Sequence, residues 1–185
     1  FTGEGVVITN VDLSRMFGVR SDLSRAAALN NPCRDGKGFV LVHAASASFP
    51  SWPEYQQLVG ATWGDSSGHG PYRAFTVSIP DTTHPITRVL AGFTAEDELW
   101  HRMSRRPEAH VLCTAYSDTA GGGTGAWEPV AYCMSFGRGR SFNLVLGHDA
   151  RALRNPNWKL LLLRGTEWTA TGEASTQCPS HRRHA

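Results

Sequence analysis

The side chains best suited to chemistry in this sequence are histidines that stand where predicted strands end. His43 directly follows the apolar run 38–42, and His148 follows the run 142–146 after a single glycine. Ligands of open parallel sheets bind outside the carboxyl ends of the strands, so two strand ends that each carry an imidazole favour one shared site. An imidazole whose pKa is near neutral can serve there as general acid or base.

Carboxylates stand close to these strand ends. Asp149 directly follows His148, and Glu98 belongs to the acidic cluster 96–98. A carboxylate can take up a proton itself, or it can orient an imidazole and raise its basicity. We therefore expect His148, Asp149 and Glu98 to form the catalytic set, while solvated carboxylates remain the alternative for the acidic cluster.

Six further residues are candidates for contact with a substrate. His69 lies between two glycines, which allow a close approach of the backbone to a ligand. Aromatic rings suit the C–H faces of sugars, although core packing explains most of them equally well. With the hydroxyl and carboxylate candidates added, the predicted substrate-binding set is His43, Ser46, Trp52, His69, Tyr116 and Glu128.

A metal site is the alternative use of the same histidines. His43, His69 and His148, with a carboxylate, are the ligand types of zinc and other divalent first-row metals. Neither H-x-x-x-H nor H-x-H spacing occurs, so such a site requires convergence in the fold. No cofactor follows with certainty from the residues, and zinc is the candidate metal.

The cysteines do not indicate redox or covalent chemistry. No C-x-x-C pair occurs, and Cys113 and Cys133 lie in apolar runs that predict buried free thiols. Ser46 is the hydroxyl candidate after the 38–42 run, but G-x-S-x-G is absent. Covalent acyl chemistry is therefore disfavoured.

The elements that must position these residues alternate between strands and helices. Residues 5–9 and 38–43 read as strands around a helix at 21–31, which is the pattern of a parallel crossover. After them the sequence predicts a short helix at 53–58, a loop at 60–71, and strands at 72–79, 99–103 and 109–116. A hairpin formed by 128–136 and 140–146 and a helix at 157–170 complete the chain. The pattern predicts an α/β sheet that is mixed but mostly parallel.

Length and composition set further bounds. The chain of 185 residues suits one domain, which we place at residues 1–174, with a polar C-terminal tail at 175–185. A formal charge of +2 gives no reason to expect a nucleic-acid partner. No apolar run approaches the ~20 residues of a membrane-spanning helix.

An ordered set of segments resembles one known family. The segments are GFVLVHAAS from Gly38, FPSWPEY from Phe49, HPIT from His84, DELW from Asp97, TAYSD from Thr114, Glu128-Pro129, GRGR from Gly137, and LGHD from Leu146. Together they resemble the trehalose-utilisation (ThuA-like) domain family, and the closing RGTEWTATG from Arg164 is similar to its last helix. The resemblance covers roughly Val6 to Gly172.

The resemblance implies a flavodoxin-like sheet with helices on both faces, related to class I glutamine amidotransferases but without their elbow cysteine. It also implies that the family's first strand and helix are missing here. The expected function is acid–base chemistry on an oxidised (3-keto) sugar or glycoside made by a partner dehydrogenase, with His43, His69, Glu98, His148 and Asp149 matching the family's pocket motifs. The alternative is a non-catalytic sugar-binding or interaction domain from a larger chain.

Overall fold

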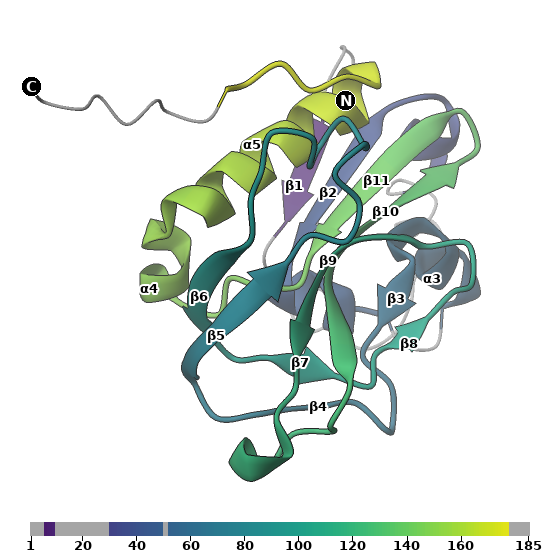
Figure 1. Cartoon of the computed structure of the whole chain (residues 1–185). Helices are drawn as coiled ribbons and strands as arrows, with labels where there is room; N and C mark the ends of the chain where they lie inside the picture. The colour runs from purple at the N-terminus through teal and green to yellow at the C-terminus, as the bar shows by residue number, and fades with distance from the viewer. Residues whose placement is uncertain (1–5, 10–29, 50–51, 178–185) are drawn as a thin grey trace, which may run out of the picture.

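The computed structural model describes residues 6–9, 30–49 and 52–177. Within them the main sheet has the strand order β1-β2-β11-β10-β9-β5-β6 (Figure 1). Its strands are β1 (Val6–Thr9), β2 (Gly38–Val42), β5 (Arg73–Ser78), β6 (Phe93–Asp97), β9 (His110–Tyr116), β10 (Trp127–Phe136) and β11 (Gly139–Leu144). Two short pairs lie beside it: β3 (Ala61–Thr62) with β8 (Ser104–Arg105), and β4 (Gly68–His69) with β7 (Trp100–His101).

The sheet is mixed, but the expectation that it is mostly parallel and flavodoxin-like is wrong. Among the described strands, only the β1–β2 and β2–β11 pairings are parallel. The β11–β10, β10–β9, β9–β5 and β5–β6 pairings are all antiparallel. The reason lies in the connections: Gly137-Arg138 joins β10 to β11, whereas a parallel crossover needs a dozen or more residues.

The remaining elements largely agree with the sequence pattern. The predicted short helix is α3 (Pro53–Val59), and the predicted final helix is α5 (Pro156–Thr171). The sequence analysis did not predict four elements: β6, the 3₁₀ turns η1 (His43–Ala47) and η2 (Thr119–Gly121), and the helix α4 (Ala150–Arg154). The short strands β3 and β4 interrupt the expected loop at 60–71. Most of the helix expected at 21–31 lies outside the described residues. Its last two residues, 30 and 31, belong to a helical segment at 30–34.

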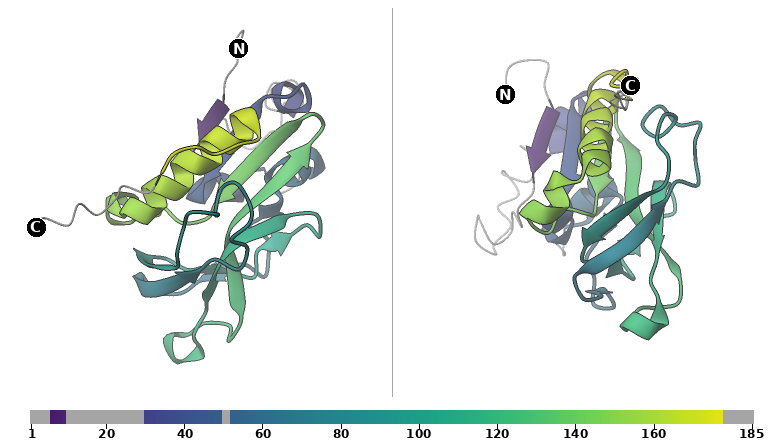
Figure 2. Two further views of the ribbon diagram at one scale, coloured as in Figure 1. Left: turned by 45° about the horizontal axis from the view of Figure 1, so that its top comes forward. Right: turned by 60° about the vertical axis from the view of Figure 1, so that its left-hand side comes forward.

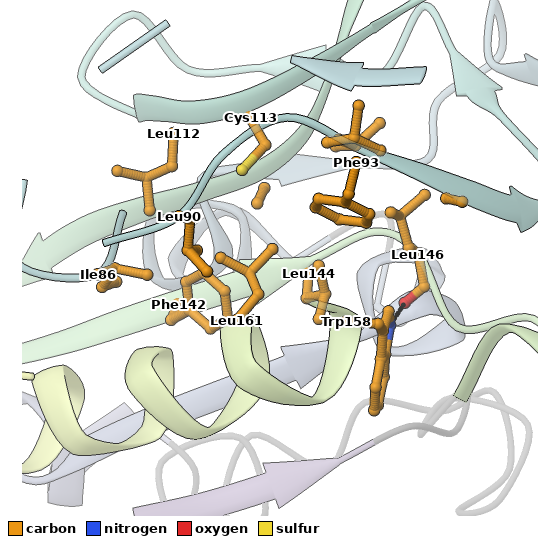
Figure 3. Close-up of a cluster of buried hydrophobic side chains, with 14 of the residues drawn as sticks. Ile86, Leu90, Phe93, Leu112, Cys113, Phe142, Leu144, Leu146, Trp158 and Leu161 are labelled. Carbon is orange, nitrogen blue, oxygen red and sulfur yellow. Dashed lines mark hydrogen bonds between the residues drawn. The ribbon is translucent and has the colours of Figure 1, made fainter. Parts of the chain in front are cut away.

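Successive side chains of β2 point to opposite faces of the sheet, and each face is covered by a helix. Val40 and Val42 pack into the cluster that contains Trp158 and Leu161 of α5 (Figure 3). Phe39 and Leu41 point the other way, into the cluster formed with Tyr55, Leu58 and Val59 of α3. The expected apolar run of β2 thus reflects a strand buried on both sides.

The last strands of the sheet curl back toward its parallel part. β6 stands at the far end of the strand order from β2, yet Asn155, just after α4, donates a side-chain hydrogen bond of 2.7 Å to the Thr94 carbonyl. α4 lies beside β6, and the views in Figure 2 show β5 and β6 turned across the rest of the sheet. Segments far apart in the strand order are therefore neighbours at one end of the molecule.

The cysteines of the described residues are unpaired. Cys113 and Cys133 are buried free thiols, as predicted, and Cys33 is a third. Burial raises the pKa of both Cys113 and Cys133 to about 12. These thiols are therefore packing groups rather than nucleophiles. In the described part of the chain, no helix has the length and apolar character needed to cross a bilayer.

A glycine in α5 allows the close approach of that helix to β11. A Cβ atom on Gly165 would overlap the ring of Phe142, which is fully buried. Gly165→Ala would gain up to about 1 kcal/mol of helix propensity, but overpacking costs typically 1–3 kcal/mol. We expect Gly165→Ala to lower the free energy of unfolding in urea by about 1–2 kcal/mol. Gly70→Ala, at a glycine with open space around it, is the control, and an unchanged or increased stability of Gly165→Ala would contradict this packing.

Candidate active site

The ends of six strands meet at one edge of the sheet. β2 and β11 are parallel and end there, and the antiparallel pairings place the start of β10, the end of β9, the start of β5 and the end of β6 at the same edge. This is the lower edge in Figure 1, next to β7. His43 follows β2, the loop with His148 follows β11, and Glu98 follows β6. The topology thus brings three distant segments to one place.

His43 sits at a strained turn between β2 and η1. Its φ is +44°, in the left-handed region that residues other than glycine rarely adopt. Its Nδ1 lies 2.8 Å from the Val145 carbonyl oxygen, so Nδ1 carries the proton and donates it. This bond fixes the tautomer and leaves the lone pair of Nε2 facing the site. Burial lowers the pKa of His43, which favours the neutral ring.

His148 and Glu98 converge on that lone pair. His148 Nδ1 lies 3.3 Å from His43 Nε2 and 3.2 Å from Glu98 Oε2. One ligand-type atom from each of the three residues lies within 4.8 Å of the other two, and no other such group of His, Cys, Asp and Glu occurs among the described residues. The His148 side chain is 43% exposed, whereas His43 is buried. A ligand can therefore reach His148 from solvent while His43 forms the floor.

A buried carboxylate positions this cluster. Asp97 accepts backbone N–H bonds from Glu98 (2.8 Å), Gly147 (2.6 Å) and His148 (3.2 Å). Burial raises the pKa of Asp97, and the three N–H donors oppose that shift. The bonds tie the end of β6 to the loop after β11, so the same carboxyl group fixes the backbone of both Glu98 and His148.

Aromatic rings line the sides of the cluster. The Trp100 ring lies 4.4 Å from the His43 ring, and Trp63 packs edge-on against Trp100 at 4.6 Å. Tyr72 lies 6.2 Å from the His148 ring, measured between centroids. The guanidinium of Arg151 lies 3.8 Å above Tyr72 and holds that ring in place. The site is thus polar at its centre and aromatic at its walls.

His69 lies beside the cluster rather than within it. Its Nδ1 is 3.7 Å from Glu98 Oε1 and 2.9 Å from the carbonyl oxygen of Gly70. It faces the oxygen of Glu98 that is turned away from His148, and its side chain is 46% exposed. The structure therefore brings Glu98, not His69, together with His43 and His148.

The remaining predicted residues have other contacts. Asp149 caps α4 and bonds to Arg151 and Tyr72, and these hydrogen bonds, that of Arg151 first, lower its pKa. Ser46 is fully buried and donates to Asn143, and Trp52 is buried against Tyr55 in the α3 core.

Two predicted residues belong to the β9–β10 hairpin. Glu128 accepts from the backbone N–H of Arg102 and from the Thr124 hydroxyl, so it fixes the hairpin to the segment after β7. Tyr116 is 43% exposed on the same hairpin.

Sequence reasoning named Asp97 only as a member of the acidic cluster 96–98, and it assigned no role to Tyr72 or Trp100. Asp97 shares the acidic run with Glu98, and only the alternating burial of β6 distinguishes an inward carboxylate from outward ones. That alternation is visible in Phe93-Thr-Ala-Glu-Asp97, where apolar residues occupy every second position before Asp97. Trp100 ends the DELW segment that carries part of the family resemblance, whereas nothing local in the sequence assigns Tyr72 to the site.

Comparison with known proteins places the chain in a family. Residues 8–169 match the family model described as ThuA, trehalose utilisation. The chain belongs to the ThuA-like family. A search among curated proteins found no match.

Solved structures of other ThuA-like proteins share the fold. One from Parabacteroides merdae is 26% identical, with a TM-score of 0.80 over 95% of this chain and 73% of its own. One from Bacteroides uniformis is 19% identical, with a TM-score of 0.67 over 94% and 72%. A β-galactosidase from Bacillus circulans, 17% identical with a TM-score of 0.56, matches over 91% of this chain and 23% of its own, which is a likeness of fold alone.

The role of the three backbone hydrogen bonds that Asp97 accepts in this ThuA-like protein, here called the Asp97 clamp, can be tested without knowledge of the substrate. In Asp97→Asn an amide group replaces one acceptor oxygen and faces backbone N–H groups. Although the neutral amide avoids the desolvation of a charge, an unsatisfied buried donor costs about 1–3 kcal/mol. We expect Asp97→Asn to lower the free energy of unfolding in urea by that amount. Glu96→Gln, an exposed change on the same strand, is the control, and equal stabilities of the two variants would contradict the clamp.

Proposed function

We propose that this ThuA-like protein acts on an oxidised sugar, a 3-keto sugar or glycoside, by acid–base chemistry at His43, Glu98 and His148. The observation that carries the proposal is the convergence of these three groups within 4.8 Å from separate segments of the chain. The family description, trehalose utilisation, supports a carbohydrate as the substrate class. The half-buried rings of Trp63 and Tyr72 suit the C–H faces of a sugar ring.

The chemistry follows from the acidity of the substrate. A carbonyl at C3 acidifies the C–H at C2, and a positioned base can remove that proton while the electron pair moves into an enediolate. When the electron pair of the enediolate moves to form a C1–C2 double bond, the C3 carbonyl is restored and the group at C1 leaves with a proton from a general acid. Return of the proton to C2 or C3 instead gives exchange or isomerisation.

Each residue has a role that fits its surroundings. We assign the base to His148, because its ring is accessible and Glu98 lies 3.2 Å from its Nδ1, where a carboxylate stabilises an imidazolium. The neutral His43 offers Nε2 as an acceptor toward the centre of the site. His69 lies at the rim next to Glu98, where it can donate to a substrate oxygen. Asp149 has a structural role: it accepts the hydrogen bond of the Tyr72 hydroxyl and caps the start of α4.

The same donor set fits a divalent metal such as zinc. Two imidazole nitrogens and a carboxylate are common zinc ligands, and tetrahedral coordination at 2.0–2.1 Å separates ligand atoms by about 3.3 Å. The 3.3 Å and 3.2 Å separations around His148 agree with that value. The bond from His43 Nδ1 to Val145 is the outer contact expected of a ligating histidine. His43, Glu98 and His148 would hold a bound metal, which would polarise the substrate carbonyl. Because ligation uses the lone pair of His148, this is the alternative to its role as the base.

The proposal also implies a partner in the reaction sequence. Sugars do not carry a 3-keto group until a secondary alcohol has been oxidised. A sugar dehydrogenase that removes a hydride from C3 would therefore supply the substrate.

Removal of the proposed base should abolish chemistry but not folding. We expect His148→Ala to reduce both the turnover of a 3-keto-glucoside and the exchange of its C2 hydrogen with D₂O by at least about 100-fold, the lower range for a general base. NMR of the sugar measures both reactions. His110→Ala is the matched control, since His110 is also an exposed imidazole paired with a carboxylate, Asp81, but at the start of β9. Full exchange in His148→Ala would remove the assignment.

Metal binding has its own test. We expect the apo protein to bind one Zn²⁺ per chain at the cluster by calorimetry, and Glu98→Gln or His43→Ala to weaken that binding at least about tenfold. His69→Ala should change the affinity less than threefold, and His110→Ala not at all. A loss in His69→Ala as large as that in Glu98→Gln would instead favour the ligand set of His43, His69 and His148.

A non-catalytic sugar-binding domain is the second candidate. The aromatic walls favour it as much as they favour an enzyme, because they describe only how a sugar would be held. Binding of the unoxidised sugar with an affinity equal to that of the 3-keto form, without exchange or product, would support this alternative.

A further inference from the structure

We propose that His84 acts as a pH-sensitive latch: its neutral ring holds the loop between β5 and β6, residues 79–92, against β9 and β10, and protonation of the ring releases that loop. The inference is independent of the proposed function. It concerns the HPIT segment that begins at His84, which carries part of the family resemblance but lies outside the histidine cluster.

The neutral ring of His84 uses both of its nitrogens. Nδ1 accepts the backbone N–H of Ile86 at 3.2 Å, so the proton of the neutral ring is on Nε2. Nε2 lies 3.7 Å from the sulfur of Cys133, which is buried in β10. A second proton would turn Nδ1 into a donor that faces the N–H of Ile86. The cationic ring therefore loses this hydrogen bond and does not fit the closed loop.

His110, at the start of β9, covers one face of the ring. The two imidazoles are stacked, with centroids 5.4 Å apart and planes tilted by 27°. His110 Nε2 lies 2.8 Å from Asp81 Oδ2, and this contact is kept when His110 takes up a proton. His110 can therefore be charged in the closed loop, and its charge opposes a charge on His84.

Asp81 favours a positive charge on His84, but both of its oxygens are engaged by other donors. Oδ2 is bonded to His110, and Oδ1 accepts from the backbone N–H and hydroxyl of Thr83 and from the backbone N–H of His84. Burial and the nearby His110 outweigh Asp81, and they lower the pKa of His84. The open loop therefore takes up a proton that the closed loop excludes.

The other charged groups around the loop are engaged with partners other than the His84 ring. They are Arg140 of β11 over the Trp168 ring, Arg164 of α5 on the carbonyl oxygens of Pro85 and Ile86, Arg88 on Glu173, and Glu167 on the backbone of Ser175 and Thr176. The Trp168 ring, which lies 5.1 Å from His84, thus already carries a guanidinium. Burial raises the pKa of Cys133 to about 12, so its thiol stays neutral. A proton on His84 in the closed loop is therefore a charge without a partner.

Release of the loop exposes part of the main core. Ile86 and Leu90 of the loop pack into the cluster that contains Leu112 and Leu161 (Figure 3). The closed loop is therefore the main form at neutral pH, and acid raises the fraction of molecules in which it is open. Hydrogen exchange of backbone amides measures local opening of this kind.

The test follows amide exchange by NMR from about pH 7.5 to about pH 5. Below about pH 6.5, we expect the protection factor of the Ile86 amide, corrected for the intrinsic effect of pH, to fall up to about tenfold per pH unit, because opening takes up one proton. In His84→Asn the side-chain oxygen replaces Nδ1 as acceptor and does not titrate, so this slope should disappear. The Leu161 amide in α5 is the internal control for global unfolding.

Three outcomes would overturn the latch. A slope that persists unchanged in His84→Asn assigns the pH dependence to another group. An equal fall at Leu161 in the wild type means acid unfolding of the whole domain rather than release of the loop. His110→Gln is the second variant, should His84→Asn not fold: without the opposing charge, the total fall at Ile86 should be about twofold smaller, and an undiminished fall would contradict the proposal.

Discussion

The three backbone hydrogen bonds accepted by the Asp97 carboxylate hold the site of this protein together. Two of them, from Gly147 and His148, join the end of β6 to the loop after β11, and the third, from Glu98, is local. The strand order places β6 and β11 far apart. Together with the hydrogen bonds of Tyr72 to Asp149 and of Asn155 to Thr94, the bonds to Asp97 fix the position of Glu98 relative to His148. A carboxylate can satisfy three N–H donors at once, which no neutral side chain of similar size does. Burial therefore disfavours the charged form of Asp97, yet this carboxylate gives the site its geometry.

A second constraint acts from below the cluster. The turn after β2 places His43 at a positive φ, and the hydrogen bond to Val145 keeps its ring oriented. Strained residues persist where the surrounding structure determines them, and they concentrate at functional sites. Here the fully buried Ser46 and Asn143 support the turn from inside.

Predictions from the sequence succeeded where local pattern was sufficient. The strands β2, β9, β10 and β11, the helices α3 and α5, and the buried thiols were all predicted from apolar periodicity and helix signals. The parallel β1–β2 pair and the β10–β11 hairpin were also predicted, but the directions of the other pairings were not, because an apolar run reads the same beside a parallel and an antiparallel neighbour. The prediction of a mostly parallel sheet relied on the first strand–helix–strand unit, whereas the strands after β2 are joined mainly by antiparallel pairings.

The sequence by itself determined the family, and it named among its candidates the three residues that converge, His43, Glu98 and His148, from strand ends and ordered motifs. Tertiary structure alone decided which of the candidates meet. It placed Glu98 rather than Asp149 or His69 beside the two imidazoles, buried Ser46 and Trp52, and set Tyr116 beside Trp127. The physical reason is that strand register and sheet curl depend on contacts between segments some 50 to 100 residues apart, such as Gly147 with Asp97 and His148 with His43, and no local spacing encodes them.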